Sequence, residues 1–201
     1  MGLADKQAQE MAIAALRKLG ATVFIDEKNP DKPVTGVELN CVKVTIKDLS
    51  HLEVLKELRV VYLCNSQIDD KALAKLSGLK QLRVLDLHRT QVTDQGMLHL
   101  RGLTQLEVLY LNDTKVGDAG IASLAGMMRL KKLQLDRTEI TDYGLLMLSN
   151  LGGLEEIDLL GTKVTDGGQE AFHQAVANAM IVRQRDGWKA YHDQFDARRD
   201  P

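Results

Sequence analysis

The sequence predicts an α/β solenoid, a curved array with a parallel sheet on its concave face and short helices on its convex face. The first observation is a leucine that recurs every 24 residues. The second is that the residues around it are nearly the same in each copy, as segments 82–96 and 154–168 illustrate. The anchors are Leu63, Leu87, Leu111, Leu135 and Leu159. A strict repeat of this length is typical of stacked coils and argues against a globule with a buried active-site cleft.

Residues 1–33 predict an N-terminal cap made of a helix and a strand. The helix covers residues 3–19 and Gly20 ends it. Its apolar face is predicted to comprise Met11, Ala12, Ala15, Leu16 and Leu19. A strand over residues 21–25 follows, and the polar turn after it allows antiparallel pairing with a strand near Val37. Because a terminal repeat exposes its core, we expect this segment to cover the first coil. The alternative is that the amphipathic helix binds a partner.

Residues 34–182 contain about six repeats, and each begins with a short strand. Leu109 and Leu111 are two positions apart, the spacing at which strand side chains point to the same side, here into the coil. A hydroxyl residue follows, and we expect it to satisfy backbone groups where the chain leaves the sheet. These residues are Ser66, Thr90, Thr114, Thr138 and Thr162.

Each repeat is then expected to form a short helix on the other side of the coil. Thr93, Thr141 and Thr165 are suited to the N-cap, and each is followed by an aspartate that the positive end of the helix dipole favours. A glycine near the helix end, such as Gly102, can provide a left-handed cap. The first copy, in segment 37–46, lacks the Asp-x-Gly triplet, so the start of its helix stays open.

The pattern L-x-x-L-x-L-x-x-T, with its T-x-V-T-D-x-G continuation, resembles the leucine-rich repeat. The closest form is the 24-residue type of bacterial proteins, akin to the ribonuclease-inhibitor class. The resemblance covers roughly residues 34–181. It implies a horseshoe whose concave face binds other proteins, and it implies no enzymatic activity.

Residues 183–201 predict a C-terminal cap or tail, because Arg183 takes the place of the core leucine. Trp188, Tyr191 and Phe195 fall on one face of a helix. One interpretation is a short helix that covers the last coil, whose edge strand needs protection. The other is a peptide that docks on a partner or on a second copy of the chain.

Composition narrows the function classes. The net charge is −2 and lysines and arginines do not cluster, so we expect no nucleic-acid partner. No apolar run is long enough to cross a membrane, and the N-terminus does not resemble a secretory leader. Cys41 and Cys64 are the only cysteines. Two thiols in a chain of this length favour a cytoplasmic protein, or a secreted or periplasmic one if a leader was removed.

The residues that vary within the repeat are predicted to form the outward surface of the sheet. Val60, Val84 and Val108 would form an exposed apolar row beside two tyrosines and several charges. This mixture is typical of protein interfaces, although strand pairing alone also favours valine and tyrosine. The predicted partner-binding set is Val60, Tyr62, Val84, Asp86, His88, Arg89, Val108, Tyr110, Asn112, Asp113, Gln134, Asp136 and Arg137.

Two columns of this surface invite more specific interpretations. Arg89, Asp113 and Arg137 alternate in sign, which fits a salt-bridge ladder, partner recognition, or both. Cys64 and His88 share a column with Asn112 and Asp136, an arrangement that suggests a cysteine hydrolase. However, an open sheet provides no oxyanion hole and nothing to lower the thiol pKa. A metal site formed by Cys41, Cys64 and His88 lacks a close pair of cysteines.

The sequence therefore predicts a non-enzymatic protein-interaction module, with no catalytic residue, metal ligand or cofactor. It is expected to be a monomer or weak homo-oligomer that binds a protein partner through the concave face. The alternatives are a self-assembling structural protein that uses the C-terminal aromatic segment, and a hydrolase based on Cys64 and His88. The fold hosts many partners, so it does not identify this one.

Overall fold

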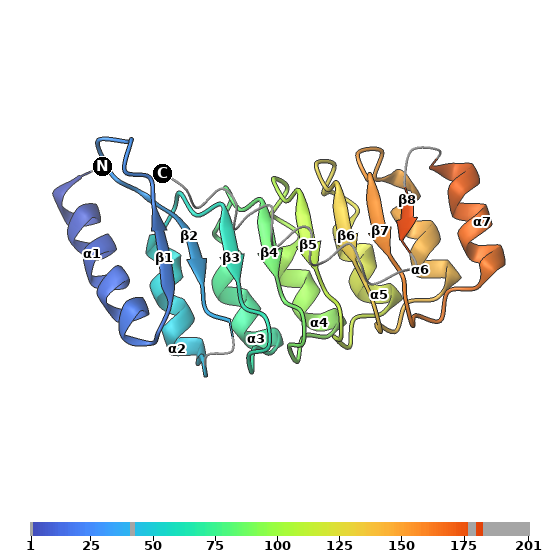
Figure 1. The fold of residues 1–201 in the computed structure, drawn as a ribbon, viewed down its shortest axis with the longest axis horizontal. Coiled ribbons are helices and arrows are strands. Elements are labelled where there is room, and N and C mark those ends of the chain that lie inside the picture. The colour runs from blue at the N-terminus through green and yellow to red at the C-terminus, as the bar shows by residue number, and fades with distance from the viewer. Residues whose placement is uncertain (1, 41–42, 177–179, 183–201) are drawn as a thin grey trace.

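The computed structural model describes residues 2–40, 43–176 and 180–182, and its strands form one eight-stranded sheet in chain order (Figure 1). The strands are β1 (Thr22–Ile25), β2 (Val34–Glu38), β3 (Val60–Tyr62), β4 (Val84–Asp86), β5 (Val108–Tyr110), β6 (Lys132–Gln134), β7 (Glu156–Asp158) and β8 (Met180–Val182). β1 pairs antiparallel with β2, and every later pair is parallel. The predicted solenoid is confirmed, with the sheet on the concave face and the helices on the convex face. The C-terminal aromatic residues lie outside the described residues.

The helices form a second row beside the sheet (Figure 1). They are α1 (Leu3–Lys18), α2 (Ile46–Leu49), α3 (Asp70–Leu73), α4 (Asp94–Met97), α5 (Asp118–Ile121), α6 (Asp142–Met147) and α7 (Asp166–Ala175). Helices α2 to α6 each continue into a 3-10 turn. These turns are η1 (Ser50–Val54), η2 (Ala74–Leu76), η3 (Leu98–Leu100), η4 (Ala122–Leu124) and η5 (Leu148–Asn150). Among the described residues, no helix is both long and apolar enough to cross a membrane.

The N-terminal segment packs on the first coil, with α1 against η1 and β1 against β2. Ala12 and Leu16 are buried in the main core, and Gly20 ends the helix with a φ of 91°. Met11, which the sequence placed on the apolar face, is 68% exposed. The prediction for Met11 is wrong because the buried stripe is narrow and centres on the line between Ala12 and Leu16.

One apolar core runs through all the coils. The anchor leucines directly after β4, β5 and β6 are fully buried, as are the leucines two positions before them. Each predicted hydroxyl donates to the carbonyl three residues earlier, for example Thr114 Oγ1 to Leu111 O at 2.6 Å and Thr138 Oγ1 to Leu135 O at 2.6 Å. The hydroxyls therefore satisfy backbone carbonyls where the chain leaves the sheet, as predicted.

The predicted N-caps are confirmed, but the predicted left-handed cap at Gly102 is wrong. Thr93, Thr141 and Thr165 accept backbone N–H groups at the starts of α4, α6 and α7. In the first repeat, Thr45 caps α2. The glycines with positive φ among the described residues are Gly20 and Gly161. Gly102 does not need that conformation because the helix before it ends in a 3-10 turn of right-handed residues.

The aspartate after each N-cap also links one repeat to the next, a role that the sequence analysis did not include. Asp118 accepts both the backbone N–H of Thr141 at 2.9 Å and its hydroxyl at 2.6 Å. The same pair of bonds joins Asp70 to Thr93 and Asp142 to Thr165, at distances between 2.7 and 2.8 Å. We call these contacts the aspartate ladder. A hydrogen bond to a charged group contributes about 1.5–3 kcal/mol to stability, roughly twice as much as a neutral one.

Candidate partner-binding face

The strand register aligns the predicted columns as the repeat pitch required. Val60, Val84 and Val108 lie opposite one another on β3, β4 and β5, and Tyr62 aligns with Asp86 and Asp86 with Tyr110. This alignment arises because each 24-residue repeat contributes one strand in the same phase. Residues of one column are therefore neighbours across about 4.8 Å.

The prediction that the valine row is exposed is wrong for most of its length. Val84 and Val108 are 5% and 7% exposed, and Tyr110 is 5% exposed. These three side chains form a second apolar cluster, and the half-buried Val60 and Tyr62 pack against it. The strands lie close enough for neighbouring side chains to cover one another, so a row of similar apolar residues packs together.

Four polar members of the predicted set are also buried, and three of them, Asn112, Gln134 and Asp136, form hydrogen bonds between strands. Asn112 Nδ2 donates to Gln134 Oε1 at 2.8 Å, and the backbone N–H of Asp136 donates to Asn112 Oδ1 at 2.9 Å. Asp136 Oδ1 in turn accepts from the backbone N–H of Leu160 at 3.2 Å. Asn112 and Asp136 thus satisfy groups of the next repeat, and Gln134 accepts from the repeat before it, which gives all three a structural role.

Arg89 and Arg137 are the exposed members of the predicted set, and with the half-buried Asp113 they form a row just after β4, β5 and β6. We call it the charged row. Its side chains are 59%, 24% and 38% exposed, respectively. Arg137 donates through Nε and Nη2 to both oxygens of Asp113, and Arg89 Nε lies 3.5 Å from Asp113 Oδ2. The hydrogen bonds from Arg137 hold the pKa of Asp113 below its ordinary value. The ladder interpretation of this row is confirmed.

The backbone of the charged row is left-handed. Arg89, Asp113 and Arg137 have φ values of 53°, 55° and 52°, and Gly161 occupies the same column with a φ of 72°. Aspartate and glycine tolerate this conformation, whereas a long side chain costs roughly 1–2 kcal/mol. This left-handed backbone was not predicted from the sequence, although Gly161 at the equivalent position indicated it.

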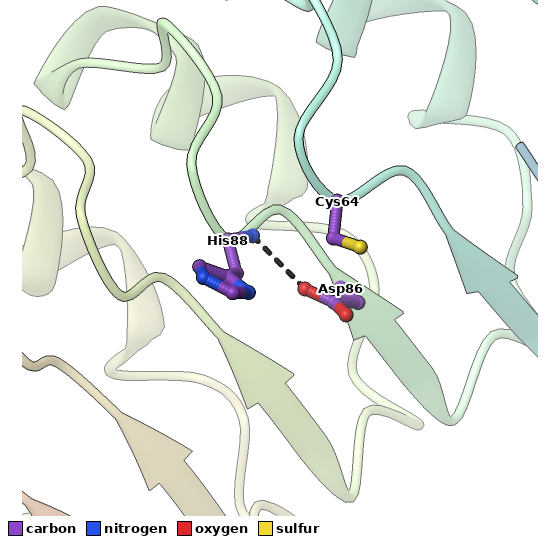
Figure 2. Close-up of side chains that lie close together, drawn as sticks. All are labelled: Cys64, Asp86 and His88. Atoms are coloured by element: carbon purple, nitrogen blue, oxygen red, sulfur yellow. Dashed lines mark hydrogen bonds between the residues drawn. The ribbon is translucent and has the colours of Figure 1, made fainter. Parts of the chain in front are cut away.

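Three chemically distinct side chains converge beside this row. Potential ligand atoms of Cys64, Asp86 and His88 all lie within 4.8 Å of one another (Figure 2). Asp86 is buried, whereas Cys64 and His88 are half-buried. Asp86 Oδ1 accepts the backbone N–H of His88 at 2.9 Å, and His88 Nε2 lies 3.7 Å from Asp113 Oδ2. Burial raises the pKa of Asp86 to about 7, and the N–H of His88 opposes this shift.

Cys64 and His88 were predicted to lie together, but Asp86 was not predicted to join them. Asp86 belongs to a different column of the sheet, yet residues i and i+2 of an extended chain point to the same side, which brings Asp86 beside His88. The other proposed members of a catalytic row, Asn112 and Asp136, are engaged in the hydrogen bonds between strands. Cys41 lies outside the described residues.

Asp136 makes the stability of the array depend on pH. Burial, followed by the neighbouring carboxylate of Asp158, raises the pKa of Asp136 to about 8. The folded side chain therefore keeps its proton up to about pH 8, whereas the unfolded one loses it near its ordinary value of about 4. We expect this group to lower the free energy of unfolding as the pH rises from about 4 to about 8. The Asp136→Asn variant, which keeps an oxygen for Leu160, should lose less stability over that range.

Urea unfolding at several pH values between about 4 and 9 measures this difference. Asp113→Asn is the control, because the pKa of Asp113 is lowered and its contribution to stability is lost only as the pH falls below about 4. Parallel pH profiles for the Asp136→Asn variant and the unaltered protein would contradict the assignment.

Comparison with known proteins agrees with this architecture. The family model described as Leucine Rich repeat matches residues 102–125, one repeat unit of the array. No curated protein matches the chain in sequence. Among solved structures, internalin C2 from Listeria monocytogenes is 22% identical with a TM-score of 0.60, and the match covers 85% of this chain and 80% of that one.

Two further structures show the same fold. An internalin (inlF) from Listeria monocytogenes is 20% identical with a TM-score of 0.55, over 86% of this chain and 54% of that one, so the chain spans about half of its length. Pollen receptor kinase 3 is 17% identical with a TM-score of 0.52, over 77% of this chain and 83% of that one. At such identities the likeness concerns the fold alone.

Proposed function

We propose that this leucine-rich repeat protein is a non-enzymatic module that binds a protein partner through the concave side of its array. We place the contact on the charged row and on the half-buried side chains next to it, Tyr62 and His88. The observation that carries the proposal is the exposed arginine Arg89 in a left-handed backbone conformation.

The stability of the fold does not explain why an arginine occupies the left-handed position 89. Glycine would adopt the same φ at lower cost, as Gly161 does in the same column. The ion pair between Arg89 and Asp113 involves an arginine whose side chain is 59% exposed, and such pairs stabilise a fold by only about 0–1 kcal/mol. A side chain kept at a conformational cost, on an open face, fits a binding role better than a structural one.

The chemistry of this face favours a partner that presents a carboxylate. Arg137 directs Nε and Nη2 to Asp113, whereas Arg89 approaches Asp113 with Nε. The planar guanidinium of Arg89 is therefore the group best placed to form a paired hydrogen bond with an aspartate or glutamate of the partner. Tyr62 and His88 would supply the apolar and polar contacts around it.

We further propose that the repeats are of the 24-residue bacterial type akin to the ribonuclease-inhibitor class, and that the protein acts in the cytoplasm. The 24-residue pitch and the strand and helix in each unit support the repeat type. Asn112 and Asp136 serve neighbouring strands, which supports a non-enzymatic role.

Replacement of Arg89 separates binding from stability. We expect Arg89→Gly to weaken partner binding about 30-fold, the effect of an interface residue worth about 2 kcal/mol. We also expect its thermal stability to stay the same or rise, because the left-handed strain is relieved. Partners captured by the unaltered protein would be identified by mass spectrometry, and their affinities for each variant measured with purified partner.

Arg101→Ala is the control, because Arg101 is an exposed arginine at the end of η3 on the helix side of the array. A partner that binds the Arg89→Gly variant as tightly as the unaltered protein would exclude the charged row as the contact. Loss of binding by the Arg101→Ala variant would place the contact on the convex side instead.

A further inference from the structure

One cluster on the sheet surface combines a thiol, a carboxylate and an imidazole, from Cys64, Asp86 and His88. Thiolate, carboxylate and imidazole are the three donor types that zinc accepts in proteins. Repeat register explains why Cys64 and His88 are neighbours, and strand geometry explains why Asp86 joins them. Register does not explain the residue types, because the next two repeats have Asn112 and Asp136 at the position of Cys64 and His88.

We propose that Cys64, Asp86 and His88 form a binding site for one zinc ion. Tetrahedral zinc with bond lengths of about 2.0–2.3 Å requires donor atoms roughly 3.4–3.6 Å apart. The three donors already lie within 4.8 Å of one another, so the set would close by rotations of the half-buried Cys64 and His88 side chains toward the buried Asp86. A thiolate together with a carboxylate neutralises the charge of a divalent ion.

The surroundings of His88 suit a metal ligand. A metal-binding histidine usually donates its second ring N–H to a carboxylate, which fixes the ring and its tautomer. Asp113 Oδ2 lies 3.7 Å from His88 Nε2, slightly beyond hydrogen-bond distance, so a small movement of either side chain would form that hydrogen bond. With its proton on Nε2, the imidazole binds the ion through Nδ1. Asp113 is itself held by Arg137, so its carboxylate has a defined position.

Asp86 can serve the ion without losing its structural contact. Its Oδ1 accepts the backbone N–H of His88 at 2.9 Å, and Oδ2 is the oxygen that would bind the metal. Three protein ligands leave the fourth position of a tetrahedral ion for water or for a ligand from outside. The thiol selects a soft or borderline ion such as zinc over magnesium or calcium, which prefer oxygen ligands.

Titration with cobalt tests the site, because a thiolate bound to tetrahedral cobalt(II) gives a charge-transfer band that ligand sets without a thiolate do not give. The reduced full chain would be stripped with a chelator, titrated with cobalt, and then titrated with zinc, which displaces the cobalt. We expect one ion per chain with the thiolate band. Cys64→Ser should abolish the band, and His88→Gln and Asp86→Asn should weaken binding by at least about tenfold.

Controls distinguish this site from other thiols and histidines. Cys41→Ser and His99→Gln should keep the band and the affinity, because Cys41 is the other cysteine and His99 is an exposed histidine in η3. Asp113→Asn should lower the affinity about 10–100-fold without removing the band. Circular dichroism of the metal-free variants confirms that each one folds. Absence of the thiolate band in the unaltered protein, or its persistence in Cys64→Ser, would overturn the proposal.

Discussion

Gly144→Ala is expected to destabilise the array by roughly 2–4 kcal/mol, the sum of an overpacked contact and weakened hydrogen bonds to a carboxylate. A Cβ at Gly144 would lie 2.9 Å from Cγ and 3.2 Å from Cα of Asp118. The carboxylate would have to move away, yet it holds the N–H and the hydroxyl of Thr141. The backbone of Asp118 cannot yield in the same way, since it begins α5.

Denaturant unfolding measures this loss, and Gly126→Ala is the matched control. A Cβ at Gly126 would meet nothing within 4 Å, and its φ is not positive. Its replacement should therefore be neutral or stabilise the protein by about 0.4–1 kcal/mol. Equal losses for the two alanine variants would show that the aspartate ladder is not the cause.

The Asp118→Ala replacement offers a second check on the aspartate ladder. It removes the carboxylate and its bonds to Thr141, but it also makes room beside Gly144. The double variant Asp118→Ala with Gly144→Ala should therefore lose less stability than the sum of the two single changes. Additive losses would mean that the alanine at position 144 does not act through Asp118.

Leu109→Ala is expected to lower the free energy of unfolding by roughly 3–5 kcal/mol. Leu109 is fully buried in the middle of the array, and the coils on both sides pack on it. Neighbouring coils are held in place by their own backbone bonds, so the cavity can collapse only in part. The change in the urea midpoint, followed by circular dichroism, measures the effect.

Leu98→Ala controls for the chemical change itself. Leu98 is 40% exposed in η3 on the convex side, so its replacement should change the stability by less than about 0.5–1 kcal/mol. Similar losses at Leu98 and Leu109 would contradict the assignment of the strand leucines to the core.

Core positions and surface positions of the same repeat differ in how much their residues vary. The core needs apolar residues of similar size in each coil, because stacked side chains must fit together, whereas the charged row and the Cys64 cluster differ in chemistry from one repeat to the next. Arg89 and His88 are therefore better candidates for function than any residue of the aspartate ladder. The two proposals can fail separately, since metal binding by Cys64, Asp86 and His88 does not require a protein partner.

Residue spacing was sufficient to predict the repeat period, the order of strands and helices, the strand register, the N-caps and the hydroxyls at the ends of the strands. Each of these features follows from the spacing within one 24-residue repeat. Because every repeat has the same length, the feature recurs in every copy. The charged row was also predictable as a column, because parallel strands of equal phase align equivalent residues.

Three features could be found only in the folded chain. They are the burial of Val84, Val108 and Tyr110, the close packing of Gly144 against Asp118, and the proximity of Cys64 to Asp86. These features depend on distances between side chains of different coils, which the apolar periodicity of the sequence does not contain. The glycine of the Asp-x-Gly triplet shows this dependence on the neighbouring coil most clearly. Within its own repeat it looks like an ordinary helix residue, but the carboxylate of the preceding coil occupies the space that a Cβ would fill.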